Sequence, residues 1–411
     1  MSKRMFSQMH KEMNNKMKHH GMRMIQSIDC HAGGEPARVI ISGLPSIPGN
    51  SMTNKREYIM NNMDELRQLL LLEPRGYPCQ NANLIFPSSN NDAKFGFIIM
   101  EQNKIYPAMS GHNCICVATA LLETGMVPMI PDNDIIYDDG SFYTTFNLEA
   151  PSGIIKIVSK CKGNKALEIQ LTNTASFMDP IHQNIPIKLP FNISEILSHK
   201  SLNPNKSNIV NIDIAFGGMW YVIIDSESIG NDFELLPSRG KDIVKLGEII
   251  KVCAQEQYPV NLNEYLDSNG NELMEYIGPD ILCFTGKSRY DNDRANAVVM
   301  SNNKLEWHKP ETFTGMIDRS PCGTGTCAVM ASRYAKNEMH VGDMFNHESI
   351  LGTVFKGVIK SESNVYRKCD NTNIACIIPE IHGNAWITQY SNIVLDNTDP
   401  FPNGFTVGDI W

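Results

Sequence analysis

Two segments far apart in the chain share one short pattern: an ionisable or hydroxylic side chain, then a glycine, then an apolar helical run. Ser110 opens the first run, which ends at Gly125, and Cys322 opens the second, which ends at Asn337. The spacing from the opening residue to the end is the same in both, and glycine and asparagine are the residues that best adopt a left-handed helix cap. A duplicated turn and helix indicate a chain built from two related halves.

A second pair of segments supports the duplication. The run from Ser27 to Gly34 and the run from Asn211 to Gly218 share Ile-Asp and Gly-Gly positions at an offset of 184 residues. Elsewhere, strand-like runs outnumber helical ones, and a helix is expected at 64–72, where Glu73-Pro74 stops it. The predicted strands are 24–29, 95–100, 154–158 and 220–224. We therefore expect an α/β fold of mixed α+β lobes.

The length of 411 residues predicts two or three domains. We place a first lobe at 24–200 and a second at 206–411, with the C-terminal segment packing back on the first lobe as an open alternative. The polar stretch Ser198 to Ser207 is the expected boundary. Residues 1–23 are rich in Met, Lys and His, and we expect a disordered tail, with a mitochondrial targeting segment as the alternative.

Composition excludes several classes of protein. The net charge of -9 gives no basic stripe, which argues against a nucleic-acid partner, and no run is apolar enough for a membrane span. The eleven cysteines lack the spacing of a disulfide framework or of paired zinc knuckles. We expect a cytoplasmic protein without a metal site. Its oligomeric state stays open, and a homodimer is one alternative.

The duplicated segments place Ser110 and Cys322 directly before helix N-termini. Such N-termini carry unpaired N–H groups and partial positive charge, so they bind a carboxylate and lower the pKa of a nearby thiol. Two of them would hold an amino-acid carboxylate with one acid/base on each face of its α-carbon, the arrangement that proton exchange at Cα needs. Either segment alone fits a structural role equally well, because glycines often precede helices. Other cysteines, such as Cys114, Cys116 and Cys327, are expected to be inert core residues.

The motifs Asp318-Arg-Ser-Pro-Cys322-Gly-Thr-Gly-Thr326 and Met109-Ser110-Gly-His112-Asn113 closely resemble the two signature loops of the proline racemase family. Further blocks of that family are matched from about Met24 to Trp411. The resemblance implies two pseudo-symmetric lobes of the diaminopimelate epimerase-like type, with the active site in the cleft between them. It also implies a small imino acid as substrate, and neither a cofactor nor a metal.

The resemblance also assigns roles to residues. Cys322 and Ser110 are the implied catalytic acid/base pair. The implied substrate-binding residues are Gly111, His112, Asn113, Asp318, Gly323 and Thr324. The backbone around Gly111, His112, Gly323 and Thr324 would hold the carboxylate, while the side chains of His112 and Asp318 would lie near the ring nitrogen. A helix-capping histidine and a turn aspartate are the structural alternatives for these two.

Serine at position 110 departs from the racemases of proline, which carry cysteine at both positions. Within the family, one serine and one cysteine resemble a hydroxyproline 2-epimerase, so we expect an isomerase that acts at Cα of a hydroxyproline or of proline. One thiol suffices to eliminate a β-hydroxyl, so a trans-3-hydroxy-L-proline dehydratase is the alternative. A catalytically inactive ligand-binding homologue is the lesser alternative. A Cys-His hydrolase would need a third, orienting group, for which the sequence offers no candidate.

Overall fold

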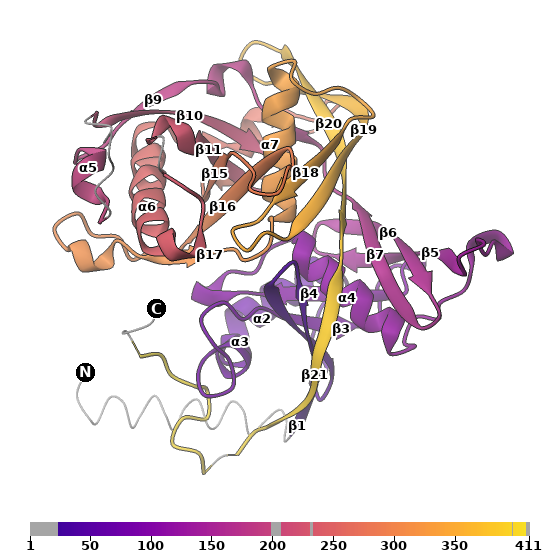
Figure 1. Cartoon of the computed structure of the whole chain (residues 1–411). Helices are drawn as coiled ribbons and strands as arrows, with labels where there is room; N and C mark the ends of the chain where they lie inside the picture. Colours follow the sequence, from indigo (N-terminus) through magenta and orange to yellow (C-terminus); the bar gives the residue numbers. More distant parts are fainter. Residues whose placement is uncertain (1–23, 199–206, 231–232, 397, 408–411) are drawn as a thin grey trace. The chain divides into compact units, whose positions relative to one another are not determined.

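The computed structural model of the chain describes residues 24–198, 207–230, 233–396 and 398–407 (Figure 1). Its contacts define two compact units. Unit 1 takes its residues from Met1–Ala32, Pro36–Ile169 and Asn384–Trp411, and unit 2 from Gly33–Glu35 and Gln170–Gly383. The lobe limits expected from the sequence stay a prediction. The tail at 1–23 and all but the end residues of the expected boundary at 198–207 lie outside the described residues.

Unit 1 combines strands with three helices in its described part. Within that part, no helix is long and apolar enough to cross a membrane, and the same holds for unit 2. The elements of unit 1, two of which extend beyond its limits, are β1 (Met24–Ala32), β2 (Glu35–Ser42), α2 (Met52–Asn62), α3 (Asp64–Leu71), β3 (Ala82–Phe86), β4 (Phe95–Met100), α4 (Gly111–Glu123), β5 (Ser141–Ala150), β6 (Gly153–Lys162), β7 (Lys165–Thr172) and β21 (Ala385–Val394).

The helices of unit 1 lie on two faces of its strands. Leu84 of β3 is buried in a core with Leu66 and Leu70 of α3. Side chains alternate along a strand, so Asn83 points to the opposite face. There its amide donates to the Asn113 side chain of α4 at 2.7 Å. The alternation of β3 thereby separates the apolar core from the polar start of α4.

Unit 2 holds the second set of strands and helices. Its elements are β8 (Ser176–Phe177), β9 (Ile185–Lys188), α5 (Ile193–Ile196), β10 (Ile209–Phe216), β11 (Trp220–Asp225), α6 (Gly240–Gln257), β12 (Val260–Asn261), β13 (Tyr265–Leu266), β14 (Ile277–Gly278), β15 (Ile281–Gly286), β16 (Arg294–Ser301), β17 (Gly315–Ile317), α7 (Gly323–Ala335), β18 (Met344–Glu348), β19 (Val354–Arg367) and β20 (Thr372–Gly383).

Strand β11 lies between the two long helices of unit 2 (Figure 1). Trp220 and Val222 are buried in the core that contains α6, and full burial of such side chains stabilises the fold by about 1.5 to 3 kcal/mol each. Tyr221 and Ile223 alternate to the other face and join the core that contains α7. This alternation directs the Tyr221 side chain toward the start of α7.

The two units share one order of strand pairings. In unit 1, β2 and β3 are parallel, β3 and β4 antiparallel, β4 and β5 parallel, and β5 and β6 antiparallel. In unit 2, β11, β15, β16, β18 and β19 pair in the same succession. The mixed α/β fold is therefore confirmed, whereas pseudo-symmetric lobes and a cleft between them stay a prediction.

The predicted helix ends agree with the structure. Helix α4 ends at Glu123 and is followed by Gly125 with φ 74°, and α7 ends at Ala335 and is followed by Asn337 with φ 60°. Helix α3 ends at Leu71, before the Glu73-Pro74 stop. The four predicted strands lie within β1, β4, β6 and β11.

Candidate active site

Cys322 immediately precedes helix α7 and occupies its N-cap position. Its φ of 61° and ψ of 109° are a left-handed conformation, which costs a non-glycine residue about 1 to 3 kcal/mol. The loop before it is held by a chain of hydrogen bonds. The Ser320 hydroxyl accepts the Cys322 N–H at 3.1 Å, and Asp318 accepts both the N–H and the hydroxyl of Ser320 at 2.8 Å. Asp318 is thus a turn residue in this structure, and its expected contact with substrate stays a prediction.

Two hydroxyl groups surround the Cys322 sulfur. The Tyr221 Oη lies 3.3 Å from Cys322 Sγ and 2.6 Å from Thr324 Oγ1, which is itself 3.9 Å from the sulfur. Gly325 leaves room for this cluster, because a Cβ at that position would lie 3.1 Å from the sulfur and 3.2 Å from the Tyr221 ring. The glycine in the first turn of α7 therefore lets the thiol and the tyrosine meet above the helix start.

The environment of Cys322 favours the neutral thiol. Burial raises the pKa of Cys322 well above its ordinary value, and the Asp318 carboxylate raises it further. Hydrogen bonds from the Tyr221 hydroxyl and the Gly325 N–H lower the pKa but do not reverse its direction. The N–H of Gly325 at the start of α7 thus acts in the expected direction, but the net pKa is raised, because the sequence pattern does not reveal how far the sulfur is removed from water.

Ser110 occupies the corresponding N-cap position before α4, with extended backbone at φ -150°. Its hydroxyl oxygen has two close side-chain partners from the first turn of the helix. Asn113 Nδ2 donates to Ser110 Oγ at 3.1 Å, and His112 Nδ1 lies 3.2 Å from the same oxygen. The amide of Asn113 is in turn oriented by β3, because Asn83 donates to Asn113 Oδ1 at 2.7 Å.

The proton on His112 can be assigned from its other ring nitrogen. Asn81 Nδ2 lies 3.1 Å from His112 Nε2 and 3.5 Å from the Pro36 carbonyl oxygen, and the carbonyl requires the NH₂ side of the amide to face it. The amide then donates to Nε2, which leaves the hydrogen of the neutral ring on Nδ1. His112 therefore donates to Ser110 Oγ.

Two donated hydrogen bonds change the character of Ser110. They stabilise an alkoxide more than a neutral hydroxyl, which makes the serine a better proton donor. They also occupy the oxygen, so the hydroxyl hydrogen of Ser110 is directed away from His112 and Asn113. The local geometry thus suits a proton donor better than a base.

The structure places the predicted site residues in two groups. Within unit 1, Ser110 is surrounded by His112 and Asn113, and Gly111 begins α4. Within unit 2, the group around Cys322 contains Asp318, Gly323 and Thr324. That the two groups act on one substrate stays a prediction.

Sequence reasoning missed three residues that complete these groups, namely Tyr221, Asn81 and Asn83. Tyr221 is separated from Cys322 by 101 positions, and the nearby Gly217 and Gly218 belong to the internal repeat and to a block that resembles the family, neither of which points to Tyr221. Gly217 packs against α7 so closely that a Cβ would lie 2.3 Å from the Thr324 carbonyl oxygen. This contact between the Gly217-Gly218 turn and α7 brings β11 close to the thiol. The duplicated Gly-Gly turn is the feature of the sequence that could have indicated this contact.

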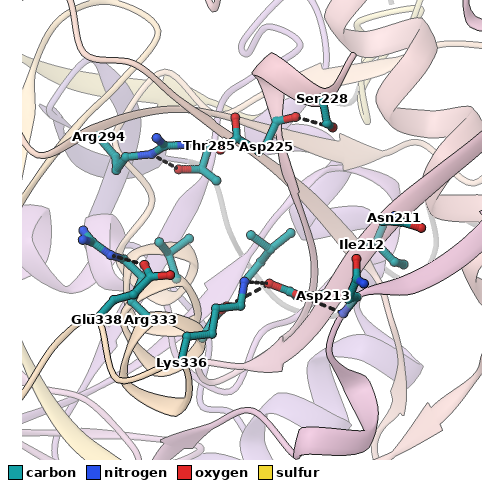
Figure 2. Close-up of a pocket in the computed structure, with 14 residues that line it drawn as sticks. Asn211, Ile212, Asp213, Asp225, Ser228, Thr285, Arg294, Arg333, Lys336 and Glu338 are labelled. Carbon is teal, nitrogen blue, oxygen red and sulfur yellow. Dashed lines mark hydrogen bonds and ion pairs between the residues drawn. The ribbon is translucent and has the colours of Figure 1, made fainter. Parts of the chain in front are cut away.

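A pocket of about 530 Å³ lies elsewhere in unit 2, and α7 lines it with its C-terminal half (Figure 2). Three cations in its wall are each paired with a carboxylate: Arg294 with Asp225, Lys336 with Asp213, and Arg333 with Glu338. The formal charges of these six groups cancel. None of the predicted site residues lines this pocket, and we assign it no part in the reaction.

The family model and the similar proteins and structures agree on one family. The family model described as Proline racemase matches residues 27–406. A proline racemase of Acetoanaerobium sticklandii is 33% identical over 93% of this chain and 98% of its own length. A 4-hydroxyproline 2-epimerase of Streptosporangium roseum is 31% identical over 93% of this chain and 98% of its own. The crystal structure of a hydroxyproline epimerase from Agrobacterium vitis, with bound trans-4-OH-L-proline, is 27% identical, with a TM-score of 0.73 over 95% of this chain and 98% of that one.

Proposed function

Because the chain belongs to the proline racemase family, we propose that it is a cofactor-independent isomerase that inverts Cα of a hydroxyproline, with proline as the alternative substrate. The observation that carries the proposal is the pair of N-cap residues, Cys322 and Ser110, each at a helix start and each held by its own hydrogen-bond network.

The chemistry follows from the acidity of the substrate. A Cα–H bond is a very weak acid, and the charge that develops on its cleavage spreads into the carboxylate. The first N–H groups of α4 and α7 have no acceptor inside their helices, so they are suited to hold that carboxylate. Fixed donors at this position stabilise the transition state more than the ground state.

The two acid/base residues have unequal roles in the proposal. Cys322 removes the α-proton as a thiolate when the substrate presents its hydrogen to the sulfur, and Ser110 donates a proton to the other face. In the reverse direction Ser110 must accept a proton, although its oxygen already accepts hydrogen bonds from His112 and Asn113. It does so as an alkoxide, which forms far less readily than a thiolate. Each forward turnover leaves a Ser110 alkoxide and a Cys322 thiol, and proton exchange with solvent restores the starting state. The proposal requires that Ser110 and Cys322 reach opposite faces of one carbon.

Two observations support hydroxyproline as the substrate. Serine at position 110 resembles the pattern of hydroxyproline epimerases, and relatives of that name match nearly the whole chain. The presence of one thiol and one hydroxyl at the two acid/base positions also favours the dehydratase alternative. One thiolate would suffice to remove the α-proton, and a hydroxyl that donates well could protonate a departing β-hydroxyl.

A substrate panel in heavy water separates these functions. The purified protein is incubated with stereoisomers of proline, 3-hydroxyproline and 4-hydroxyproline, and products are followed by optical rotation and mass spectrometry. We expect deuterium at Cα together with inversion of a hydroxyproline. Loss of water from trans-3-hydroxy-L-proline without inversion would establish the dehydratase, and absence of label in every compound would establish a binding protein without turnover.

Binding of the carboxylate is tested separately with pyrrole-2-carboxylate, whose planar ring imitates the deprotonated substrate. A ligand that binds only the folded state raises its stability by RT ln(1 + [L]/Kd), so we expect a higher melting temperature and competitive inhibition. Pyrrole, which lacks the carboxylate, is the matched control and should give no shift. No shift with pyrrole-2-carboxylate at millimolar concentration would contradict the proposed carboxylate site.

A further inference from the structure

We infer that Tyr221 is a positioning residue for the thiol: together with Thr324 it forms a hydrogen-bond relay that reverses its direction whenever Cys322 gains or loses a proton. The inference rests on the proposed function, because a thiol that alternates between neutral and charged states needs a partner for both. It adds a role for a residue that lies 101 positions from Cys322 in the chain.

The geometry places one hydroxyl between two exchangeable partners. Tyr221 Oη is 2.6 Å from Thr324 Oγ1 and 3.3 Å from Cys322 Sγ, whereas Thr324 Oγ1 is 3.9 Å from the sulfur. Tyrosine is therefore the central member, in contact with both of the others. Its side chain is fully buried, and its ring lies beside Gly325 of α7.

Donors and acceptors balance in both states of the sulfur. When Cys322 is a thiol, its S–H donates to Tyr221 Oη, and the tyrosine hydroxyl donates to Thr324 Oγ1. When Cys322 is a thiolate, the Thr324 hydroxyl donates to Tyr221 Oη, and the tyrosine hydroxyl donates to the sulfur. Each hydroxyl keeps its own proton and only rotates, so the single proton that moves is the one exchanged between sulfur and Cα.

The titration of Tyr221 agrees with this role. Burial raises the pKa of its hydroxyl well above the ordinary value, and proximity to Cys322 raises it further. The tyrosine therefore stays protonated while the thiol cycles. It lowers the pKa of Cys322 by its hydrogen bond, against the larger effect of burial.

In the described part of unit 1, the position that corresponds to Tyr221 carries no hydroxyl. At the offset of 184 residues that relates the two Gly-Gly turns, Tyr221 corresponds to Ala37. Ser110 instead has the permanent donors Asn113 and His112. The reversible relay thus accompanies Cys322, the residue proposed to alternate between a neutral and a charged state.

The test measures the reactivity of Cys322 without turnover. Alkylation by iodoacetamide is followed by mass spectrometry of the Cys322 peptide between about pH 7 and pH 10, in the wild type and in Tyr221→Phe. A hydrogen bond to a charged sulfur corresponds to about one to two pKa units, half of which is offset by the greater nucleophilicity of a more basic thiolate. Below the pKa of the thiol, we expect Tyr221→Phe to react about 3- to 10-fold more slowly.

Further variants separate the relay from a packing effect. Tyr265→Phe removes the hydroxyl of another fully buried tyrosine of unit 2, which contacts Asp179 and His182 instead, and should alkylate like the wild type. Thr324→Val should slow alkylation and Thr324→Ser should restore it, which keeps the test decisive if Tyr221→Phe fails to fold.

Turnover provides the second measurement. In Tyr221→Phe, kcat for deuterium exchange from the Cys322 face should fall and its pH profile move to higher pH, while KM stays near the wild-type value. Wild-type alkylation rates in both Tyr221→Phe and Thr324→Val would overturn the inference whatever the turnover. Slower alkylation in a protein that exchanges no Cα proton would retain the relay and reject the proposed function.

Discussion

Replacing Cys322 with serine is expected to lower the rate of α-proton exchange by about 10²- to 10⁴-fold, the contribution typical of a positioned acid/base. The change substitutes an alkyl hydroxyl, which ionises far less readily, for the thiol beside Tyr221. Circular dichroism and the melting temperature should remain close to those of the wild type, because the two side chains are similar in size.

Cys327→Ser is the matched control. Cys327 is a fully buried cysteine within α7, and it lies outside the group around Cys322. This variant should retain turnover. Retention of more than a few per cent of the wild-type rate in a folded Cys322→Ser protein would reject Cys322 as the base.

The pH dependence of turnover provides a further test of Cys322. Because burial raises the pKa of Cys322, the thiolate fraction is small near neutral pH and grows as the pH rises. The kcat/KM for the stereoisomer deprotonated by Cys322 should therefore increase with pH across the neutral and mildly alkaline range. Cys327→Ser should retain this profile.

Ser110 variants should have the second large effect, and they should separate inversion from exchange. Ser110→Ala removes the proposed donor, so we expect inversion to fall by about 10²- to 10⁴-fold while label still exchanges from the Cys322 face. If the chain is a dehydratase, loss of water should persist. Ser110→Cys supplies two thiols and should give comparable rates in both directions, together with measurable activity on unsubstituted proline.

The control for Ser110 is Ser159→Ala, because Ser159 is a fully buried serine of unit 1 whose hydroxyl accepts only from Cys161 in the described contacts. Chiral chromatography gives the rate of inversion, and mass spectrometry gives the rate of exchange. An Ser110→Ala protein that epimerises a hydroxyproline at the wild-type rate would show that Ser110 is not the second acid/base.

Local features of the fold could be predicted from the sequence because they depend on neighbouring residues. The left-handed caps at Gly125 and Asn337 follow from the backbone preferences of those two residues, and the strand β4 from its apolar run. The N-cap positions of Ser110 and Cys322 followed from the duplication. The strand order within each unit has no such local signal, because it depends on pairings between distant segments.

The parts of the site that could not be predicted depend on packing. Tyr221 reaches Cys322 because β11 alternates and because Gly217 allows close approach to α7, and neither contact is visible in the sequence around the thiol. The helix N-terminus lowers the pKa of Cys322 as expected, but the larger effect of burial, which raises it, depends on packing and has no local signal in the sequence. Asn81 determines the tautomer of His112 from another segment of the chain.

The hydrogen bonds described above for Ser110 come from unit 1 and those for Cys322 come from unit 2, so the two networks have no protein partner in common among these contacts. Groups without shared partners contribute nearly additively to free energy, so a substitution in one network leaves the other intact. The chain can therefore be regarded as two interchangeable modules, one that supplies a charge-switching thiol and one that supplies a hydroxyl. We expect that a second thiol at position 110 would change which substrates are inverted without altering the contacts of Cys322, so substrate range and base strength would be open to separate engineering.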